Sequence, residues 1–171
     1  MKLNEINIDS YETLLLDRDG TINVHIIDGY VCKWKDFEFI PGVLEAMPKF
    51  AQRFNHIFVV TNQRGIGKGY YSDDDLAEIH DHMKAEIEKV GGRIDGIYYC
   101  SAIDDDDHNR KPNIGMYEQI LHDYPDVKNT NCIMLGDSKV DRCFAENCGI
   151  DFVCVDSMKR IGNSKFWVYP A

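Results

Sequence analysis

The sequence has 171 residues, a formal net charge of −10, 44% hydrophobic residues and 28% charged residues. This length suits one compact domain, and the composition is that of a globular protein rather than a disordered or fibrous one. The excess of acids argues against nucleic acids as partners, because their binding depends on Lys and Arg that neutralise phosphates. We therefore expect a single domain over residues 1–171 that acts on a small molecule.

The N-terminal segment carries acidic and polar side chains where a secretory signal needs a basic end and an apolar stretch. No window approaches about 18 uninterrupted apolar residues, so no membrane span or membrane partner is expected. Six scattered cysteines form no C-x-x-C pair, which predicts reduced, mostly buried thiols. These features predict a cytoplasmic protein. A monomer or a small homo-oligomer is expected.

Five short apolar segments have the length and composition of buried strands, and helical patterns separate them. The first segment ends in acids, which is typical of a strand whose carboxyl end opens onto solvent. The alternation predicts an α/β fold with a mostly parallel sheet that helices cover on both faces. The expected strands are 13–17, 56–61, 94–100, 132–136 and 151–155.

Caps and apolar spacing predict the helices. Pro41 opens a helix that continues through about 54. Ser72 caps the clearest helix, and Asp75 reaches back from its third position to complete the cap. Two further helices are expected, one with Pro112 in its first turn and one over about 139–147.

The connection over about 20–40 is the one long link that does not have a plain helical pattern. It is longer than the roughly 2–6 residues usual for an α/β loop, and such long loops are usually functional. A purely structural role is the alternative. Its aromatic residues predict a small packed flap or hairpin, and the FWVY sequence within 162–171 suggests one last edge strand.

Polar residues gather where the predicted strands end. Ligands of open α/β sheets bind outside the carboxyl ends of the strands, so these residues are candidates for the chemistry. Each segment alone is also a common turn or strand end, and only their joint occurrence in this order favours a site. The segments are Asp17-Arg18-Asp19-Gly20-Thr21, Thr61-Asn62-Gln63, Arg110-Lys111-Pro112, and Gly136-Asp137-Ser138 with Asp141.

The acids in these segments fit phosphoryl transfer, which needs an in-line nucleophile, a cation and a proton source. Asp17 can attack phosphorus to give an aspartyl-phosphate. Asp19 can protonate the leaving oxygen and later activate water. Asp17 and Asp137 also offer the carboxylate oxygens that Mg²⁺ prefers, so magnesium is the expected cofactor.

The other polar residues can hold the transferring group. Lys111 supplies positive charge opposite the metal, while the Thr61 hydroxyl and the Asn62 N–H can donate to the phosphoryl oxygens. These donors complete the set that phosphoryl transfer requires.

A phosphorylated substrate requires local positive charge in a protein that is acidic overall. Arg64 and Lys68 follow the second predicted strand, and Arg110 precedes a predicted helix, all on the predicted rim. The fork of an arginine suits Arg64 and Arg110 to a second, non-reacting phosphate, whereas a plain surface role for Lys68 is equally open. Strand alternation is expected to turn Arg18 away from the two acids beside it.

The motifs DRDGT, VVTNQ, RKP and GDSKVD resemble, in this order, the four motifs of the haloacid dehalogenase (HAD) superfamily of phosphatases. LLLDRDGTIN, GYV…FEFIPGV, VVTNQRGIGKG and DGIYYC are similar to its branch of D,D-heptose 1,7-bisphosphate phosphatases and histidinol-phosphatases. The resemblance covers about 12–155. It implies a Rossmann-like, three-layer α/β/α core without a cap domain and with only a small flap over about 20–40.

Carried onto this sequence, the resemblance implies specific roles. Asp17 would be the nucleophile and Asp19 the general acid and base, while Thr61 and Lys111 would stabilise the transferred phosphoryl group. The magnesium ligands that it implies are Asp17, the Asp19 carbonyl and Asp137, with Asp141 farther from the ion.

One segment departs from the branch. Its members commonly carry a zinc-binding loop of Cys and His residues before the RKP motif, whereas 100–110 here holds only Cys100 and His108. No structural zinc is therefore predicted, and the branch says less about the substrate, because that loop borders the pocket. The four acids at 104–107 are interpreted as a solvated loop, with a metal-binding role as the alternative.

The sequence thus predicts a magnesium-dependent phosphatase for a small phosphorylated metabolite, with heptose 1,7-bisphosphate first and histidinol phosphate second. A polynucleotide 3′-phosphatase is the alternative within the superfamily, which the negative charge opposes. A receiver-type phosphoacceptor domain is the alternative outside it. Asp19 and Thr21 oppose the receiver, because a receiver has no use for an acid two residues after a nucleophile on its first strand.

Overall fold

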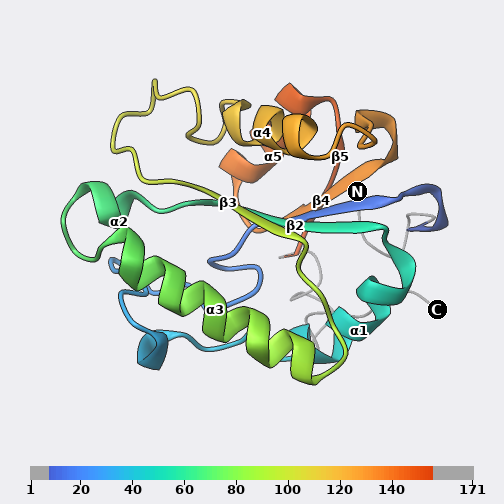
Figure 1. The fold of residues 1–171 in the computed structure, drawn as a ribbon. Helices are drawn as coiled ribbons and strands as arrows, with labels where there is room; N and C mark the ends of the chain where they lie inside the picture. The colour runs from blue at the N-terminus through green and yellow to red at the C-terminus, as the bar shows by residue number, and fades with distance from the viewer. Residues whose placement is uncertain (1–7, 156–171) are drawn as a thin grey trace.

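The computed structural model describes residues 8–155, which form a five-stranded sheet between layers of helices (Figure 1). Every strand pair is parallel, and the strand order is β3-β2-β1-β4-β5. The predicted α/β class is confirmed, and each expected strand is present, with β3 starting later than expected. The strands are β1 (Thr13–Leu16), β2 (His56–Asn62), β3 (Gly96–Cys100), β4 (Cys132–Gly136) and β5 (Asp151–Cys154).

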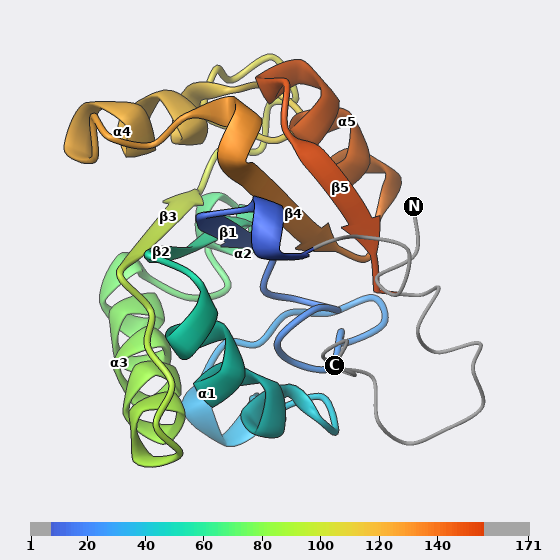
Figure 2. The same ribbon diagram turned by 90° about the vertical axis from the view of Figure 1, so that its right-hand side faces the viewer.

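Helices cover both faces of the sheet (Figures 1 and 2). On one face lie α1 (Val43–Arg53) and α3 (Asp73–Lys89), and on the other lie α4 (Gly115–Asp123) and α5 (Lys139–Cys148). A short helix, α2 (Arg64–Gly67), follows β2 and was not expected. The connections after β1 and β3 carry no long helical insertion between residues 8 and 155, so the architecture is capless.

Alternate strand residues divide the core into two layers. In β1, Leu14 and Leu16 belong to the cluster that includes α1 and α3, whereas Leu15 belongs to the cluster that includes α4 and α5. Burying a leucine completely contributes roughly 1.5–3 kcal/mol relative to leaving it exposed. Because both faces are covered, the strands are continuous apolar runs rather than alternating ones.

The helix caps follow local sequence in α3. The Ser72 hydroxyl accepts a hydrogen bond from the Asp75 N–H at 3.1 Å, and the Asp75 carboxylate accepts one from the Ser72 N–H at 2.9 Å. This is the predicted capping box. A second box at the start of α5, between Ser138 and Asp141, was not predicted.

The helix expected to hold Pro112 in its first turn begins later. The Asn113 N–H donates to the Arg110 carbonyl at 2.8 Å, so the chain makes a turn around Pro112 before α4 starts at Gly115. The prediction for this boundary is wrong because Pro112 is the third residue of a four-residue turn, and local sequence does not distinguish a proline in a turn from one in a first helical turn.

The link between β1 and α1 folds back on itself as a small flap. The Val24 N–H donates to the Glu38 carbonyl at 2.8 Å, which joins the two ends of the flap. Trp34 stacks on Phe37 with ring centroids 4.9 Å apart, and on His82 of α3 at 5.1 Å. The flap is therefore anchored to the helical layer beside the sheet.

Two expectations concern the ends of the chain and its cysteines. The suggested edge strand within 162–171 lies outside the described residues. None of the six cysteines forms a disulfide; Cys100, Cys132 and Cys148 are buried, and the other three are partly exposed. Between residues 8 and 155 no helix combines the length and apolarity needed to cross a membrane.

Candidate active site

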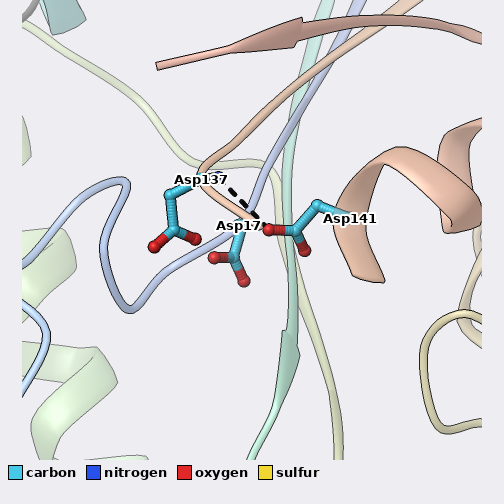
Figure 3. A group of neighbouring side chains, drawn as sticks. All are labelled: Asp17, Asp137 and Asp141. Atoms are coloured by element: carbon cyan, nitrogen blue, oxygen red, sulfur yellow. Dashed lines mark hydrogen bonds between the residues drawn. The ribbon is translucent and has the colours of Figure 1, made fainter. Parts of the chain in front are cut away.

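The carboxyl ends of β1, β2 and β4 meet at one edge of the sheet because these three strands are parallel neighbours. Asp17 directly follows β1, and Asp137 directly follows β4. Asp141 lies in the first turn of α5, and Figure 3 shows that the three carboxylates face one another. One oxygen from each lies within 4.8 Å of the others, so the predicted convergence of Asp17 and Asp137 is present.

Gly20 permits the close approach of the β1 loop to Asp137. Its φ is +85°, a conformation that favours glycine, and a Cβ there would lie 1.9 Å from Asp137 Oδ2. The turn also needs its three N–H donors, from residues 21, 22 and 23, all of which reach the Arg18 carbonyl. Backbone geometry thus requires the glycine of the DRDG sequence.

Lys111 occupies the centre of the site with only 3% of its surface exposed. Its Nζ donates to Asp17 Oδ1 at 2.7 Å, to Asp141 Oδ1 at 2.7 Å and to the Val60 carbonyl at 2.9 Å. These three acceptors use all the donors of the ammonium group. Burial alone would lower the pKa of Lys111, but the charges of Asp141 and Asp17 raise it well above its ordinary value.

The two carboxylates that share Lys111 have opposite pKa shifts. Burial and the neighbouring Asp141 charge raise the pKa of Asp17, although Lys111 opposes the shift. Burial would also raise the pKa of Asp141, but Lys111 and the hydrogen bonds from Ser138 hold it below its ordinary value. Asp141 is therefore held in its ionised form, whereas the charged form of Asp17 is disfavoured even though Lys111 pairs with it.

The acidic group suits a hard divalent cation. Asp17, Asp137 and Asp141 carry three formal negative charges against the single positive charge of Lys111, which leaves two to be neutralised. Carboxylate oxygens of this kind are the ligands that magnesium takes. One carboxylate oxygen of Asp141 accepts from Lys111, and the other accepts from the Ser138 hydroxyl and from the N–H groups of Asp137 and Ser138. With both oxygens already bonded, Asp141 fits a position outside the direct ligands of the cation.

The Asn62 side chain fixes the backbone of Lys111. Its Nδ2 donates to the Lys111 carbonyl at 3.1 Å, and its Oδ1 accepts from the Lys111 N–H at 2.9 Å. This reciprocal pair links the end of β2 to the RKP segment and sets the direction of the lysine. The predicted donation from the Asn62 N–H to a phosphoryl oxygen stays a prediction.

Asp19 is held by three side-chain donors. Its Oδ1 accepts from Arg18 Nη2 at 2.8 Å and Asn23 Nδ2 at 2.9 Å, and its Oδ2 accepts from Gln63 Nε2 at 3.0 Å. Burial would raise the pKa of Asp19, but the Arg18 charge and these hydrogen bonds hold it below its ordinary value. The free protein therefore keeps Asp19 as an oriented carboxylate.

The expectation that Arg18 turns away from both acids is wrong for Asp19. The strand ends at Leu16, and the chain enters a turn whose N–H groups donate to the Arg18 carbonyl. Strand alternation therefore no longer sets the direction of this side chain. Its guanidinium lies fully buried against Asp19 and His80.

Sequence reasoning missed the residues that support Asp19 and Thr61. Gln63 donates to the Thr61 hydroxyl at 2.9 Å as well as to Asp19, and its carbonyl oxygen accepts from the Tyr71 hydroxyl. Gln63 belongs to the VVTNQ motif, which could have identified it as a site residue. No motif in the sequence singles out Tyr71 or His80. Thr61 itself is buried at the end of β2.

His80 is expected to make folding stability depend on pH. Arg18 Nη1 lies 3.1 Å from His80 Nε2, so that nitrogen accepts and the ring is neutral. Burial, followed by the Arg18 charge, lowers the pKa of His80 to about 3 from its ordinary 6.5. Because the pKa of His80 is lower in the folded chain than in the unfolded chain, the neutral ring contributes its full stability above pH 6.5. That stability is lost as pH falls from 6.5 toward 3.

The titration of His80 is expected to lower the free energy of unfolding by roughly 2 kcal/mol between pH 7 and pH 5. Urea denaturation at the two pH values measures it. His80→Gln keeps an acceptor for Arg18 but does not titrate, so its stability is expected to change much less, whereas the control His122→Gln, at a side chain that is 89% exposed, behaves like the parent. An equal loss in His80→Gln and the parent contradicts the assignment.

A cavity of about 410 Å³ opens over these groups. Asp17, Asp19, Asp137 and Lys111 line it, as do three of the four predicted substrate residues. Lys68 and Thr61 are the predicted site residues that do not line it: Lys68 is exposed, with its Nζ 5.7 Å from the Tyr30 ring centre. The substrate residues that do line it are Asn62, Arg64 and Arg110.

The acidic loop at 104–107 is solvated, as interpreted, but it also makes specific contacts. Asp105 Oδ1 accepts hydrogen bonds from both Arg64 and Arg110. Asp107 Oδ1 accepts from the Asn109 N–H at 2.9 Å. The loop therefore contacts the cavity wall through Arg64 and Arg110, two basic residues that line the cavity.

Comparisons with known proteins identify relatives of this chain. Its sequence matches the family described as polynucleotide kinase 3 phosphatase over residues 13–158. A D-glycero-alpha-D-manno-heptose-1,7-bisphosphate 7-phosphatase of Mycobacterium bovis is 37% identical over 141 residues, which cover 78% of this chain and 71% of that protein. The enzyme of the same name from Campylobacter jejuni is 35% identical over 153 residues, 89% of this chain and 87% of that protein.

A solved structure shares the fold. The crystal structure of D,D-heptose 1,7-bisphosphate phosphatase from B. bronchiseptica, complexed with magnesium and phosphate, has a TM-score of 0.77 and 32% sequence identity. The match covers 82% of this chain and 78% of that one. Family, relatives and structure agree with the four motifs and their geometry. The chain therefore belongs to the polynucleotide kinase 3 phosphatase family, and with its relatives to the HAD superfamily of phosphatases.

Proposed function

We propose that this protein is a magnesium-dependent phosphatase that removes the 7-phosphate from D-glycero-D-manno-heptose 1,7-bisphosphate. The observation that carries the chemistry is the buried Lys111 ammonium, 2.7 Å from both Asp17 and Asp141, beside the third carboxylate of Asp137. The substrate is supported by the names of the relatives from Mycobacterium bovis and Campylobacter jejuni. The reaction breaks the bond between phosphorus and the sugar oxygen.

In the first step an Asp17 carboxylate oxygen attacks phosphorus, and the leaving sugar oxygen takes a proton from Asp19. The bound phosphate dianion supplies the negative charge that raises the pKa of Asp19 enough for it to carry that proton. In the second step Asp19, again a carboxylate, takes a proton from the water that attacks the aspartyl-phosphate. This hydrolysis regenerates the Asp17 carboxylate and releases inorganic phosphate.

The remaining residues hold the transferring group and the cation. Lys111 faces Asp17 and stabilises negative charge on the phosphoryl oxygens. Magnesium would be held by Asp17, Asp137 and the Asp19 carbonyl, and when bound it neutralises the charge of the carboxylates and of the phosphate. Thr61 acts through its position at the end of β2, where Gln63 fixes its hydroxyl.

Magnesium is expected to stabilise the folded protein, because it binds a group of carboxylates that exists only there. At about one hundred times its Kd, the ion raises the free energy of unfolding by about 2.7 kcal/mol. Thermal unfolding in magnesium and in EDTA measures the shift. Asp137→Asn is expected to lose most of it, whereas Asp106→Asn, which removes an equal charge from an exposed loop, keeps it. A full shift in Asp137→Asn contradicts this metal site.

The second phosphate of the substrate is assigned to Arg64 and Arg110. Both line the cavity, and a single carboxylate oxygen of Asp105 lies within hydrogen-bond reach of both. Arginine forks match phosphate oxygens in geometry and charge. Lys68 lies farther out, so we assign it at most a role in attracting the substrate.

A kinetic panel tests the substrate. It compares both anomers of heptose 1,7-bisphosphate with heptose 7-phosphate, histidinol phosphate and a 3′-phosphorylated oligonucleotide, all with magnesium. We expect kcat/KM for one bisphosphate anomer to exceed that for histidinol phosphate by about a hundredfold, because only the bisphosphate fills the arginine pair. Faster release from histidinol phosphate overturns the proposed substrate without affecting the chemistry.

A polynucleotide 3′-phosphatase is the second candidate, and the description of the matching family favours it. The net charge of −10 opposes it, because nucleic-acid binding needs a basic surface. The oligonucleotide in the panel distinguishes the two. A receiver-type domain is disfavoured because Asp19 is built into the site by three donors, an arrangement that a phosphoacceptor alone does not need.

The cytoplasmic location, the oligomeric state and the predicted lack of structural zinc near Cys100 and His108 stay predictions. Metal analysis of the purified protein after dialysis tests the last of these. Stoichiometric zinc that survives dialysis contradicts it.

A further inference from the structure

Asp105 joins two arginines that belong to different parts of the chain. Its Oδ1 accepts from Arg64 Nη2 at 2.8 Å and from Arg110 Nε at 3.1 Å. Arg64 begins α2 after β2, and Arg110 belongs to the segment before α4. Both arginines line the cavity, whereas the Asp105 side chain is 83% exposed and does not.

This geometry shows that the two guanidinium groups can bind one anion together. A single oxygen atom lies within hydrogen-bond distance of both, and a carboxylate oxygen is the same kind of charged acceptor as a phosphate oxygen. Asp105 therefore occupies the position where an external anion would bind the arginine pair.

The loop that carries Asp105 is held in place by its own hydrogen bonds. Asp104 Oδ1 accepts from the Asp106 N–H at 2.9 Å, and Asn113 Nδ2 donates to the carbonyls of Asp105 at 3.0 Å and Asp107 at 2.8 Å. These bonds fix the backbone on both sides of Asp105. The loop backbone therefore directs the Asp105 side chain toward Arg64 and Arg110.

We propose that Asp105 is an internal ligand of the Arg64–Arg110 pair, which the non-reacting phosphate of the substrate displaces. The inference rests on the proposed function, in which this pair binds the second phosphate. Asp105 offers one negative charge, whereas a phosphate dianion offers two charges and three oxygens. Competition from Asp105 therefore weakens the binding of every external anion to Arg64 and Arg110. It disfavours singly charged anions most strongly, and it helps the monophosphate product to dissociate.

The test measures binding of a sugar 1-phosphate to the full chain. Calorimetric titration with α-D-mannose 1-phosphate in magnesium is expected to give a Kd about three- to tenfold lower for Asp105→Asn than for the parent, since two exposed ion pairs no longer compete. The matched control Asp106→Asn removes the same charge from the same loop but leaves both arginine contacts in place. Its Kd is expected to change less than about twofold.

A double-mutant cycle identifies where the effect arises. In the Arg64→Gln background the gain from Asp105→Asn is expected to shrink toward that of the control, because one partner of the competing carboxylate is already gone. A gain of equal size in Asp105→Asn and Asp106→Asn overturns the inference. So does a gain that persists unchanged without Arg64.

Kinetics separates this inference from the proposed function. With heptose 1,7-bisphosphate, Asp105→Asn is expected to lower KM rather than raise kcat, and KM for heptose 7-phosphate stays constant because that substrate lacks the second phosphate. If the parent does not hydrolyse the bisphosphate but the titration shows the gain, the proposed substrate is wrong and the internal ligand stands. If it does hydrolyse the bisphosphate and the titration shows no gain, the internal ligand is wrong.

Discussion

Asp17→Asn is expected to reduce kcat for phosphate release by about 10⁴-fold or more, because the amide cannot attack phosphorus. The fold is expected to survive. Asn is nearly isosteric with Asp, its carbonyl oxygen can still accept from Lys111, and Asp141 continues to pair with Lys111. The substitution also removes the buried charge and its repulsion with Asp141 and Asp137, which together raise the pKa of Asp17. Activity and stability therefore change in opposite directions.

Two measurements check this expectation. Phosphate release in magnesium gives the rate, and thermal unfolding in EDTA gives the stability without the metal. Mass spectrometry of acid-quenched enzyme is expected to detect a phosphorylated chain in the parent and none in Asp17→Asn. The surface variant Asp106→Asn serves as the control and keeps both the rate and the covalent intermediate. Near-parental phosphate release by Asp17→Asn would show that another group is the nucleophile.

Lys111→Met is expected to lower both activity and stability. Methionine has a similar volume, so the effect comes from charge: Asp17 and Asp141 stay buried and lose their shared ammonium. Removing one partner of a buried ion pair costs about 3–5 kcal/mol, and the loss of the phosphoryl-stabilising charge lowers kcat by about 10²–10³-fold. Urea denaturation in EDTA and phosphate release in magnesium measure the two effects.

The pH dependence of Lys111→Met gives a further check. Without the ammonium, the pKa of Asp17, which is already raised, rises further, and burial raises the pKa of Asp141 above that of the unfolded chain. The destabilisation is then largest above those folded pKa values and shrinks as pH falls and the carboxylates take up protons. Lys111→Met/Asp141→Asn is expected to regain part of the stability but none of the activity. Unchanged stability in Lys111→Met contradicts the role of the ion pairs.

Local sequence was sufficient for the strands and for one edge of the site. Short apolar runs predicted β1 and β4, and a parallel sheet then brings Asp17 and Asp137 together at their carboxyl ends. The reason is geometric, because parallel strands present their carboxyl ends at one edge. The capping box of Ser72 and Asp75 was equally local, since its partners are three residues apart.

Local sequence was insufficient where two structures share one signature. Pro112 suits both a turn and a first helical turn, and only the packed chain shows that α4 starts at Gly115. Arg18 follows a strand, but the turn after Leu16 redirects its side chain to Asp19 and His80. In both cases hydrogen bonds of the surrounding backbone override the expectation for the isolated segment.

The fold class, the four motifs and the residue types needed for phosphoryl transfer could be read from the chain alone, because they depend on short-range pattern and intrinsic chemistry. The tertiary structure decided which charges meet. Lys111 lies 94 residues from Asp17 and 30 from Asp141, and Arg64 lies 41 from Asp105. Such pairs follow from the strand order and from the packing of loops against it, neither of which is encoded in any single segment.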